Sequence, residues 1–166
     1  MERGRTVDVA PVVENGRIAF VSDSVFTASM GLAGADALCN LDAAAAQLPG
    51  TYRAWLGSSA GGPDSRFAPA GDPWRRVDGP RLAPTAADLL SPTSPPYLST
   101  FLNRTASGVV FVDRLWVGSV TENCADWTST AGEGAVGNPI ATHAEERRDS
   151  LSFPCVFDHR INCLQL

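Results

Sequence analysis

Four cysteines constrain this chain more than any other feature of its sequence. They are Cys39, Cys124, Cys155 and Cys163. No C-x-x-C pair occurs, and His143 and His159 are the only histidines, so the pattern does not favour a structural zinc site. An even number of cysteines without metal or redox spacing favours disulfide bonds in an oxidising compartment over buried free thiols. Three connectivities are possible, and spacing alone does not choose among them.

The length and charge of the chain exclude several classes of protein. Its 166 residues suffice for one domain that buries roughly 70% of the unfolded surface, and 44% of them are hydrophobic. The net charge of −5 argues against a nucleic-acid partner, which needs a basic face on the protein. All 13 cationic residues are arginine, so chemistry that depends on lysine is excluded.

Membrane and export signals are not visible in the sequence. No apolar run approaches the roughly 18 to 20 residues that span a bilayer, so we expect no membrane insertion. The start, Met1–Arg5, is not followed by the apolar stretch of a signal peptide. If the cysteines are bridged, we expect a secreted or cell-surface protein whose leader lies outside this sequence.

Local patterns predict an α+β fold with short antiparallel strands, one early helix and long loops. The polar residues 1–16 are expected to form a poorly ordered N-terminal segment before a single domain over 17–166. Asp36 suits the positive end of a helix and is expected to lie in its first turn. The expected elements are strands over 17–21 and 51–56, a helix over 36–47, a short strand or turn over 74–77, a helical turn over 85–90, strands over 109–112 and 115–118, a glycine-rich loop through Gly132, Gly134 and Gly137, and a terminal hairpin of 155–157 with 160–164.

Five short motifs occur in one order along the chain. They are GADALC at 34–39, GTYRAWL at 50–56, WVGS at 116–119, CADW at 124–127, and the seven residues enclosed by Cys155 and Cys163. From about Ile18 to Leu164 the sequence thereby resembles endostatin, the C-terminal domain of collagen XVIII. It also resembles endostatin-like domains of secreted bacterial proteins that have no assigned activity.

The resemblance implies a C-type lectin-like fold, in which the first strand lies beside the last and a long loop region emerges from one side. It also implies two nested disulfides, Cys39 with Cys163 and Cys124 with Cys155. The outer bridge would join the first helix to the last strand. A Cys155–Cys163 bridge across a terminal hairpin would leave that helix unattached.

Calcium-dependent sugar binding by C-type lectins uses an E-P-N or Q-P-D loop and a W-N-D strand motif. Neither loop motif occurs here, and Ser152 occupies the position that corresponds to the W-N-D aspartate. Because calcium takes six to eight oxygen ligands, we expect no calcium sugar site. We also expect no other metal and no cofactor. The alternative is a set of improvised ligands from the loop over 128–150, namely Glu133, Asn138 and Asp149.

Two properties of endostatin transfer only in part. Its zinc site uses an N-terminal histidine cluster, and residues 1–13 contain no histidine. Its heparin site uses surface arginines, and arginine forks suit sulfate well. The candidate ligand surface here combines an aromatic residue in a proline-rich loop with nearby and distant arginines, namely Trp74, Arg75, Arg76, Arg147 and Arg148. The alternatives are core packing for Trp74 and arginines solvated beside acidic neighbours.

No catalytic constellation is visible. His143 and His159 are the only bases that titrate near neutral pH, and no G-x-S-x-G elbow occurs. We therefore expect a binding or adhesion module outside the cell that recognises a carbohydrate or protein ligand without calcium, rather than an enzyme. The alternatives are a hydrolase that uses His143 or His159 and a structural domain of a larger bacterial envelope protein.

Overall fold

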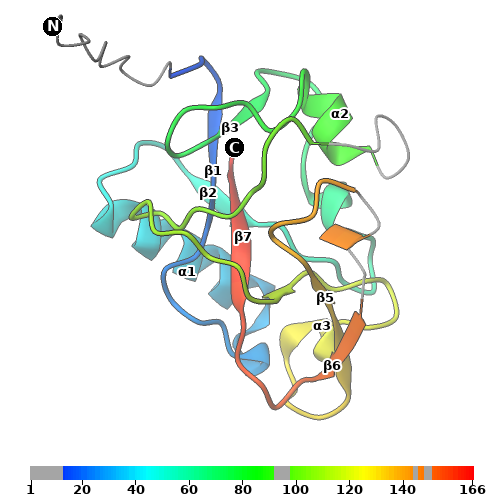
Figure 1. Ribbon diagram of the computed structural model, residues 1–166. Coiled ribbons are helices and arrows are strands. Elements are labelled where there is room, and N and C mark those ends of the chain that lie inside the picture. The colour runs from blue at the N-terminus through cyan, green and yellow to red at the C-terminus, as the bar shows by residue number, and fades with distance from the viewer. Residues whose placement is uncertain (1–12, 92–97, 144–145, 148–150) are drawn as a thin grey trace, which may run out of the picture.

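The computed structural model describes residues 13–91, 98–143, 146–147 and 151–166. Residues 1–12 of the predicted N-terminal segment lie outside this description. The centre is a mixed sheet with the strand order β3-β1-β7-β4-β5-β6, and β2 also pairs with β7 (Figure 1). The strands are β1 (Arg17–Val21), β2 (Tyr52–Ala54), β3 (Trp74–Arg76), β4 (Leu115–Trp116), β5 (Glu133–Gly137), β6 (Leu151–Pro154) and β7 (Arg160–Gln165). The α+β prediction and the strand predicted over 17–21 are confirmed. The expectation of antiparallel strands holds only in part, because β1 pairs with β3 and β4 pairs with β7 in parallel.

The last strand, β7, holds the sheet together. Its sequence RINCLQ is buried over its four central residues. It runs antiparallel to β1, with Phe20 opposite Cys163, and antiparallel to β2, with Ala54 opposite Cys163. Its first two residues pair in parallel with β4. The two ends of the described domain therefore lie side by side.

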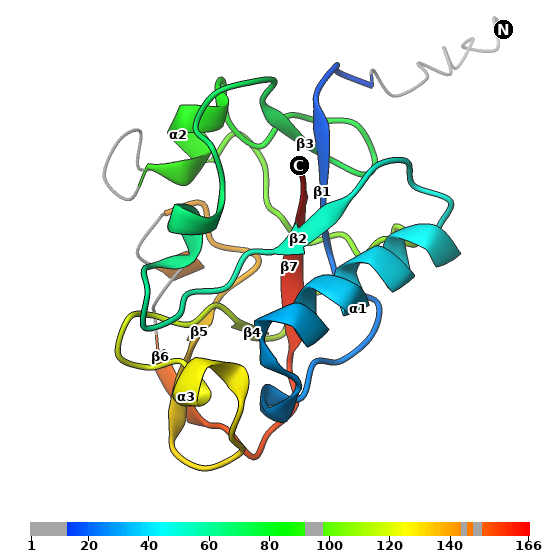
Figure 2. The same ribbon diagram turned by 180° about the vertical axis from the view of Figure 1, so that it is seen from behind.

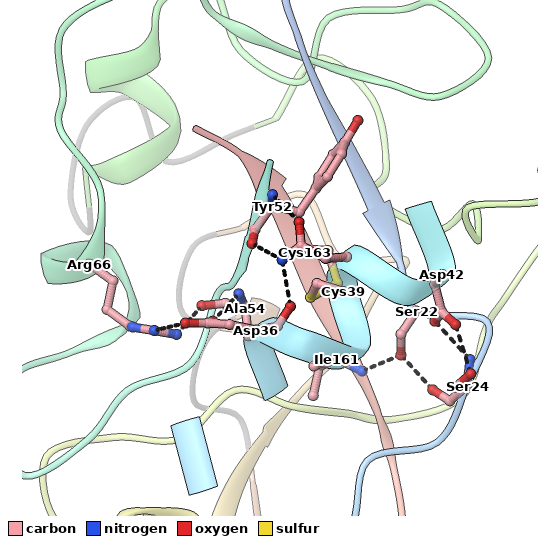
Figure 3. The surroundings of a disulfide bond; sticks show 11 residues. Ser22, Ser24, Asp36, Cys39, Asp42, Tyr52, Ala54, Arg66, Ile161 and Cys163 are labelled. Carbon is pink, nitrogen blue, oxygen red and sulfur yellow. Dashed lines mark hydrogen bonds and ion pairs between the residues drawn. A yellow bond between two sulfur atoms is a disulfide. The ribbon is translucent and has the colours of Figure 1, made fainter. Parts of the chain in front are cut away.

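The helix α1 (Gly31–Ala45) crosses one face of this sheet (Figure 2). It begins at Gly31 rather than Asp36, after a 3₁₀ turn, η1 (Ala28–Met30). The prediction that Asp36 lies in the first turn is wrong, because the helix already begins at Gly31. The Asp36 carboxylate instead accepts a hydrogen bond from the Ala54 N–H of β2 at 2.8 Å. Asn40, one turn later, brackets Tyr52 with bonds of 2.9 Å to its N–H and 2.8 Å to its carbonyl. These two side chains therefore occupy the free edge of β2, and Figure 3 shows Asp36 beside Ala54 there.

Two hydrophobic clusters lie on opposite faces of the sheet. The cluster under α1 contains Phe20, Leu38 and Ile161, and alternation along the strands places Ala19 and Leu164 in the other cluster. The second cluster includes α2 (Ala86–Leu90), where the predicted helical turn is confirmed. None of the helices in the described part of the chain has the length and apolar character needed to span a bilayer.

Three predicted elements differ from the structure. The terminal hairpin is wrong, because β7 pairs with β1, β2 and β4 while β6 pairs with β5. The glycine-rich loop is wrong at its second half, because Gly134 and Gly137 lie in β5, where a Cβ on either would collide with neighbouring atoms. Residues 109–112 form only a single bridge, between Val110 and Arg104.

Both disulfides form as the nested pairing requires. Cys39 of α1 bonds to Cys163 of β7, and Cys124 bonds to Cys155, with Cα–Cα separations of 5.6 and 5.7 Å. All four cysteines are therefore bonded. The outer bridge fastens the helix to the central strand across the larger hydrophobic cluster (Figure 3).

The two bridges are expected to differ in their contribution to stability. They span sequence separations of 124 and 31 residues, so the chain-entropy relation gives about 5 kcal/mol for the outer bridge and about 4 kcal/mol for the inner one. Urea unfolding should show a larger loss in the free energy of unfolding for the double variant Cys39→Ser, Cys163→Ser than for the double variant Cys124→Ser, Cys155→Ser. An unchanged free energy of unfolding in the first of these would contradict the role of the outer bridge.

Candidate functional site

Trp74 is fully buried, which corrects the candidate ligand surface. It lies on β3, its indole N–H donates to the Gln165 carbonyl at 2.8 Å, and the Arg17 guanidinium covers its ring at 3.6 Å. Phe67 packs edge-on against the same ring. The indole therefore offers no surface on which a ligand could stack.

The described arginines of that candidate surface, Arg75, Arg76 and Arg147, lie in different settings. Arg76 forms a two-pronged ion pair with Asp78, at 2.5 and 2.8 Å, and also donates to the Asn103 side chain at 3.0 Å. Arg147 is only 4% exposed, and Arg148 lies outside the described residues. Arg75 remains partly exposed on β3. For Arg76 the alternative reading, an arginine paired with an acidic neighbour, is therefore the correct one.

An unusual turn carries the inner disulfide. Cys124, Ala125, Asp126 and Trp127, which form α3 (Cys124–Trp127), all have φ between 54° and 63°. A left-handed conformation costs on the order of 1 to 2 kcal/mol for each residue with a side chain, so the surroundings must hold it. No glycine or asparagine within the four residues signals this turn in the sequence.

Three contacts hold the left-handed turn. The Asn123 carboxamide accepts from the Asp126 N–H at 2.9 Å. The Asp126 carboxylate accepts from the N–H and hydroxyl of Ser59, at 2.7 and 2.6 Å, and these bonds lower its pKa. The buried indole of Trp127 donates to the Gly57 carbonyl at 2.8 Å. The turn is thus fastened to residues 57–59 as well as to the disulfide.

A group of hydroxyls and one carboxylate lies next to this turn. It is called the polar corner here and consists of Ser119, Thr121, Glu122 and Ser152. The Glu122 N–H donates to the Ser119 hydroxyl at 3.0 Å, and the Ser119 N–H donates to the Glu122 carbonyl at 3.0 Å. The Ser152 hydroxyl, on edge strand β6, donates to the Glu122 carboxylate. All four residues are partly or fully exposed.

The polar corner includes the position that the resemblance associates with a calcium ligand. Ser152 stands there, and its partner Glu122 is the only carboxylate of the corner. Of the improvised ligands, Glu133 is exposed on β5, the Asn138 side chain accepts from the Ile140 N–H, and Asp149 lies outside the described residues. Among the described residues no three His, Cys, Asp or Glu side chains are grouped to hold a metal ion.

His159 lies in an aromatic setting. Its ring centroid is 4.6 Å from that of Trp116 and 5.5 Å from that of Phe153, both edge-on. Burial lowers the pKa of His159, against smaller opposing effects from Asp113, the Arg114 carbonyl and Asp158. His143 is exposed in another loop.

Comparison with known proteins adds no assignment. No protein-family model matches this chain, and no curated protein is significantly similar to it. Its function must therefore be inferred from its own residues and their geometry.

The setting of His159 predicts how stability depends on pH. Because folding lowers its pKa below the ordinary 6.5, the unfolded chain binds a proton more readily, and the free energy of unfolding should fall as pH drops through 6.5. Urea titrations from neutral to acidic pH should show this slope reduced in His159→Gln and retained in His143→Gln. Equal slopes in His159→Gln and the unaltered protein would contradict it.

Proposed function

We propose that this chain is an extracellular binding module of the C-type lectin-like class that recognises a carbohydrate at the polar corner without calcium. The observation that carries the proposal is the juxtaposition of Ser152 and Glu122 beside the disulfide-bonded turn. The proposal joins the sequence resemblance with the chemistry of that juxtaposition.

Several features of the molecule support the lectin-like class. The first and last strands pair, the outer disulfide joins the first helix to the last strand, and the inner disulfide fastens a loop between β4 and β5. The WVGS motif has a packing role, because Gly118 has a φ of 69° and a Cβ there would lie 2.5 Å from the Trp127 ring. Trp116 and Trp127 pack edge-on at 5.5 Å.

The chemistry of the polar corner suits a polyol. Hydroxyls donate and accept at once, and the Glu122 carboxylate accepts only, so together they complement the neighbouring hydroxyls of a sugar ring. A bond from a ligand hydroxyl to an ionised acceptor contributes more than a bond between neutral groups. The left-handed turn and its disulfide hold the corner in one geometry, which reduces the entropy lost on binding.

Calcium is not needed for this mode of recognition. The ion requires six to eight oxygen ligands, and those that bind it tightly include several carboxylates. Ser152 supplies a neutral hydroxyl in place of a carboxylate and is already bonded to Glu122. We therefore assign sugar recognition to direct hydrogen bonds.

The two disulfides favour a location outside the cytoplasm. Such bonds form and persist in oxidising compartments and are rare where glutathione and thioredoxin keep thiols reduced. Both bridges join elements far apart in the sequence and lie within the larger hydrophobic cluster. In a secreted or cell-surface module both disulfides would stay oxidised.

A glycan array tests the proposal directly. Binding to at least one glycan should persist in chelator. Ser152→Ala and Glu122→Gln should each weaken that binding about tenfold or more, because each removes a hydrogen bond in which the Glu122 carboxylate or its neighbouring hydroxyl takes part. Ser99→Ala and Glu146→Gln, at exposed positions outside the corner, are matched controls. The proposal fails if no glycan binds, if chelator abolishes binding, or if the controls weaken it equally.

A further inference from the structure

Phe153 connects the polar corner to a histidine on the inner side of β6. It follows Ser152 along the strand, and because side chains alternate in a strand, the two point to opposite faces. On one face the Ser152 hydroxyl donates to the Glu122 carboxylate. On the other face Phe153 packs against the hydrophobic cluster under α1 and against the His159 ring, with ring centroids 5.5 Å apart. A change at His159 can therefore be transmitted to Ser152 through one strand.

Of the two rings that contact His159, the one on β6 is the less firmly held. β6 is last in the strand order, pairs with β5 over Leu151–Pro154, and has only partly or fully exposed residues. Trp116, whose ring centroid lies 4.6 Å from that of His159, is fully buried and packs edge-on against Trp127. An edge strand of this kind opens at a lower free energy than the core does. If the packing around His159 opens, we expect β6 to move and Trp116 to stay.

A second proton on the His159 ring would be buried without an acceptor. One hydrogen bond joins the ring to the Arg114 carbonyl. The nitrogen Nε2 is buried and has no hydrogen-bond partner among the described residues, and the same holds for the indole nitrogen of Trp116. A buried charge without a partner is strongly unfavourable, so the protonated ring requires contact with water.

Two carboxylates near His159 oppose the effect of burial. Burial has the largest effect and lowers the pKa of the ring, while Asp113, from the residues before β4, and Asp158, from the loop of His159 itself, raise it. The Arg160 guanidinium is engaged with other residues. Neither β4 nor β6 carries a charged side chain. Residues 24–28, whose main chain is bonded to that of His159, carry none either.

These contacts favour one arrangement for the neutral ring and another for the charged ring. With a neutral ring, Phe153 stays packed on His159 and Ser152 stays bonded to Glu122. With a charged ring, movement of β6 admits water and removes the effect of burial, while the two neighbouring carboxylates still stabilise the charge. Protonation therefore shifts the equilibrium towards the arrangement in which β6 has moved away from the core.

We propose that protonation of His159 releases β6 from the core, separates Ser152 from Glu122 and thereby weakens glycan binding at the polar corner. This inference rests on the function proposed above, to which it adds regulation by pH. Such a module holds its glycan at neutral pH and releases it in a mildly acidic medium. Because linkage is reciprocal, a bound glycan that keeps β6 in place lowers the pKa of His159 further.

An NMR titration without any glycan tests the coupling between His159 and β6. Between about pH 7.5 and about pH 5, where histidine changes its charge, the amide signals of Ser152 and Phe153 should shift with the same midpoint as the His159 ring protons. Exchange of the β6 amides with solvent should become faster over the same range. Both changes should be absent in His159→Phe, which keeps an aromatic ring that takes no proton, and retained in His143→Gln. If His159→Phe does not fold, His159→Gln replaces it.

The glycan array repeated at both ends of this range tests the effect on binding. Glycans bound at about pH 7.5 should bind about fivefold more weakly at about pH 5, and this difference should disappear in His159→Phe but not in His143→Gln. Glycan binding that is equal at both pH values overturns the pH regulation and leaves the proposed function standing. If no glycan binds at either pH, the proposed function fails, while the amide titration still decides the coupling. Stationary β6 amides during the titration of His159 overturn that coupling.

Discussion

The bond between Cys39 and Cys163 joins the two elements on which the rest of the fold depends. Cys163 sits in the middle of β7, opposite Phe20 on one side and Ala54 on the other. Once α1 is fixed to this strand, Asp36 and Asn40 reach the edge of β2 and replace the strand that would otherwise pair there. A single covalent contact thus aligns a helix and three strands, although the residues it joins are 124 positions apart.

The inner disulfide acts locally and serves the loops. The left-handed turn at 124–127 is unfavourable by itself, and it persists because Asn123, Ser59 and the disulfide each hold part of it. The polar corner begins immediately before this turn. The contacts thus hold residues 124–127 in a backbone conformation that they would not adopt alone, and the adjacent side chains of the polar corner keep a constant arrangement.

The sequence predicts those features that depend on neighbouring residues. The strand over 17–21 follows from its β-branched and aromatic side chains, and the helix follows from its apolar spacing. Local patterns do not predict the pairing of β7 with β1, because Asp158 and His159 resemble a hairpin turn while the true partners are more than 140 residues away; only the resemblance places the first strand beside the last. Core packing of Trp74 is the alternative that the sequence leaves open beside an exposed stacking surface, and the contacts that decide it come from Arg17 and Gln165, near opposite ends of the chain. Of the candidate site, sequence position singled out Ser152 but not its partner Glu122.

The all-arginine composition has a structural explanation in the loops. Residues 57–96 contain many prolines, which have no N–H to donate, so main-chain carbonyls there need other donors. Guanidinium groups supply them: Arg17 donates to the Asp72 and Ala70 carbonyls, and Arg53 donates to that of Arg66. A guanidinium has five N–H donors in a planar fork, so one arginine can satisfy a carbonyl and an acid at once, as Arg66 does with Ala54 and Asp36. Arginines used in this way support the loops from within.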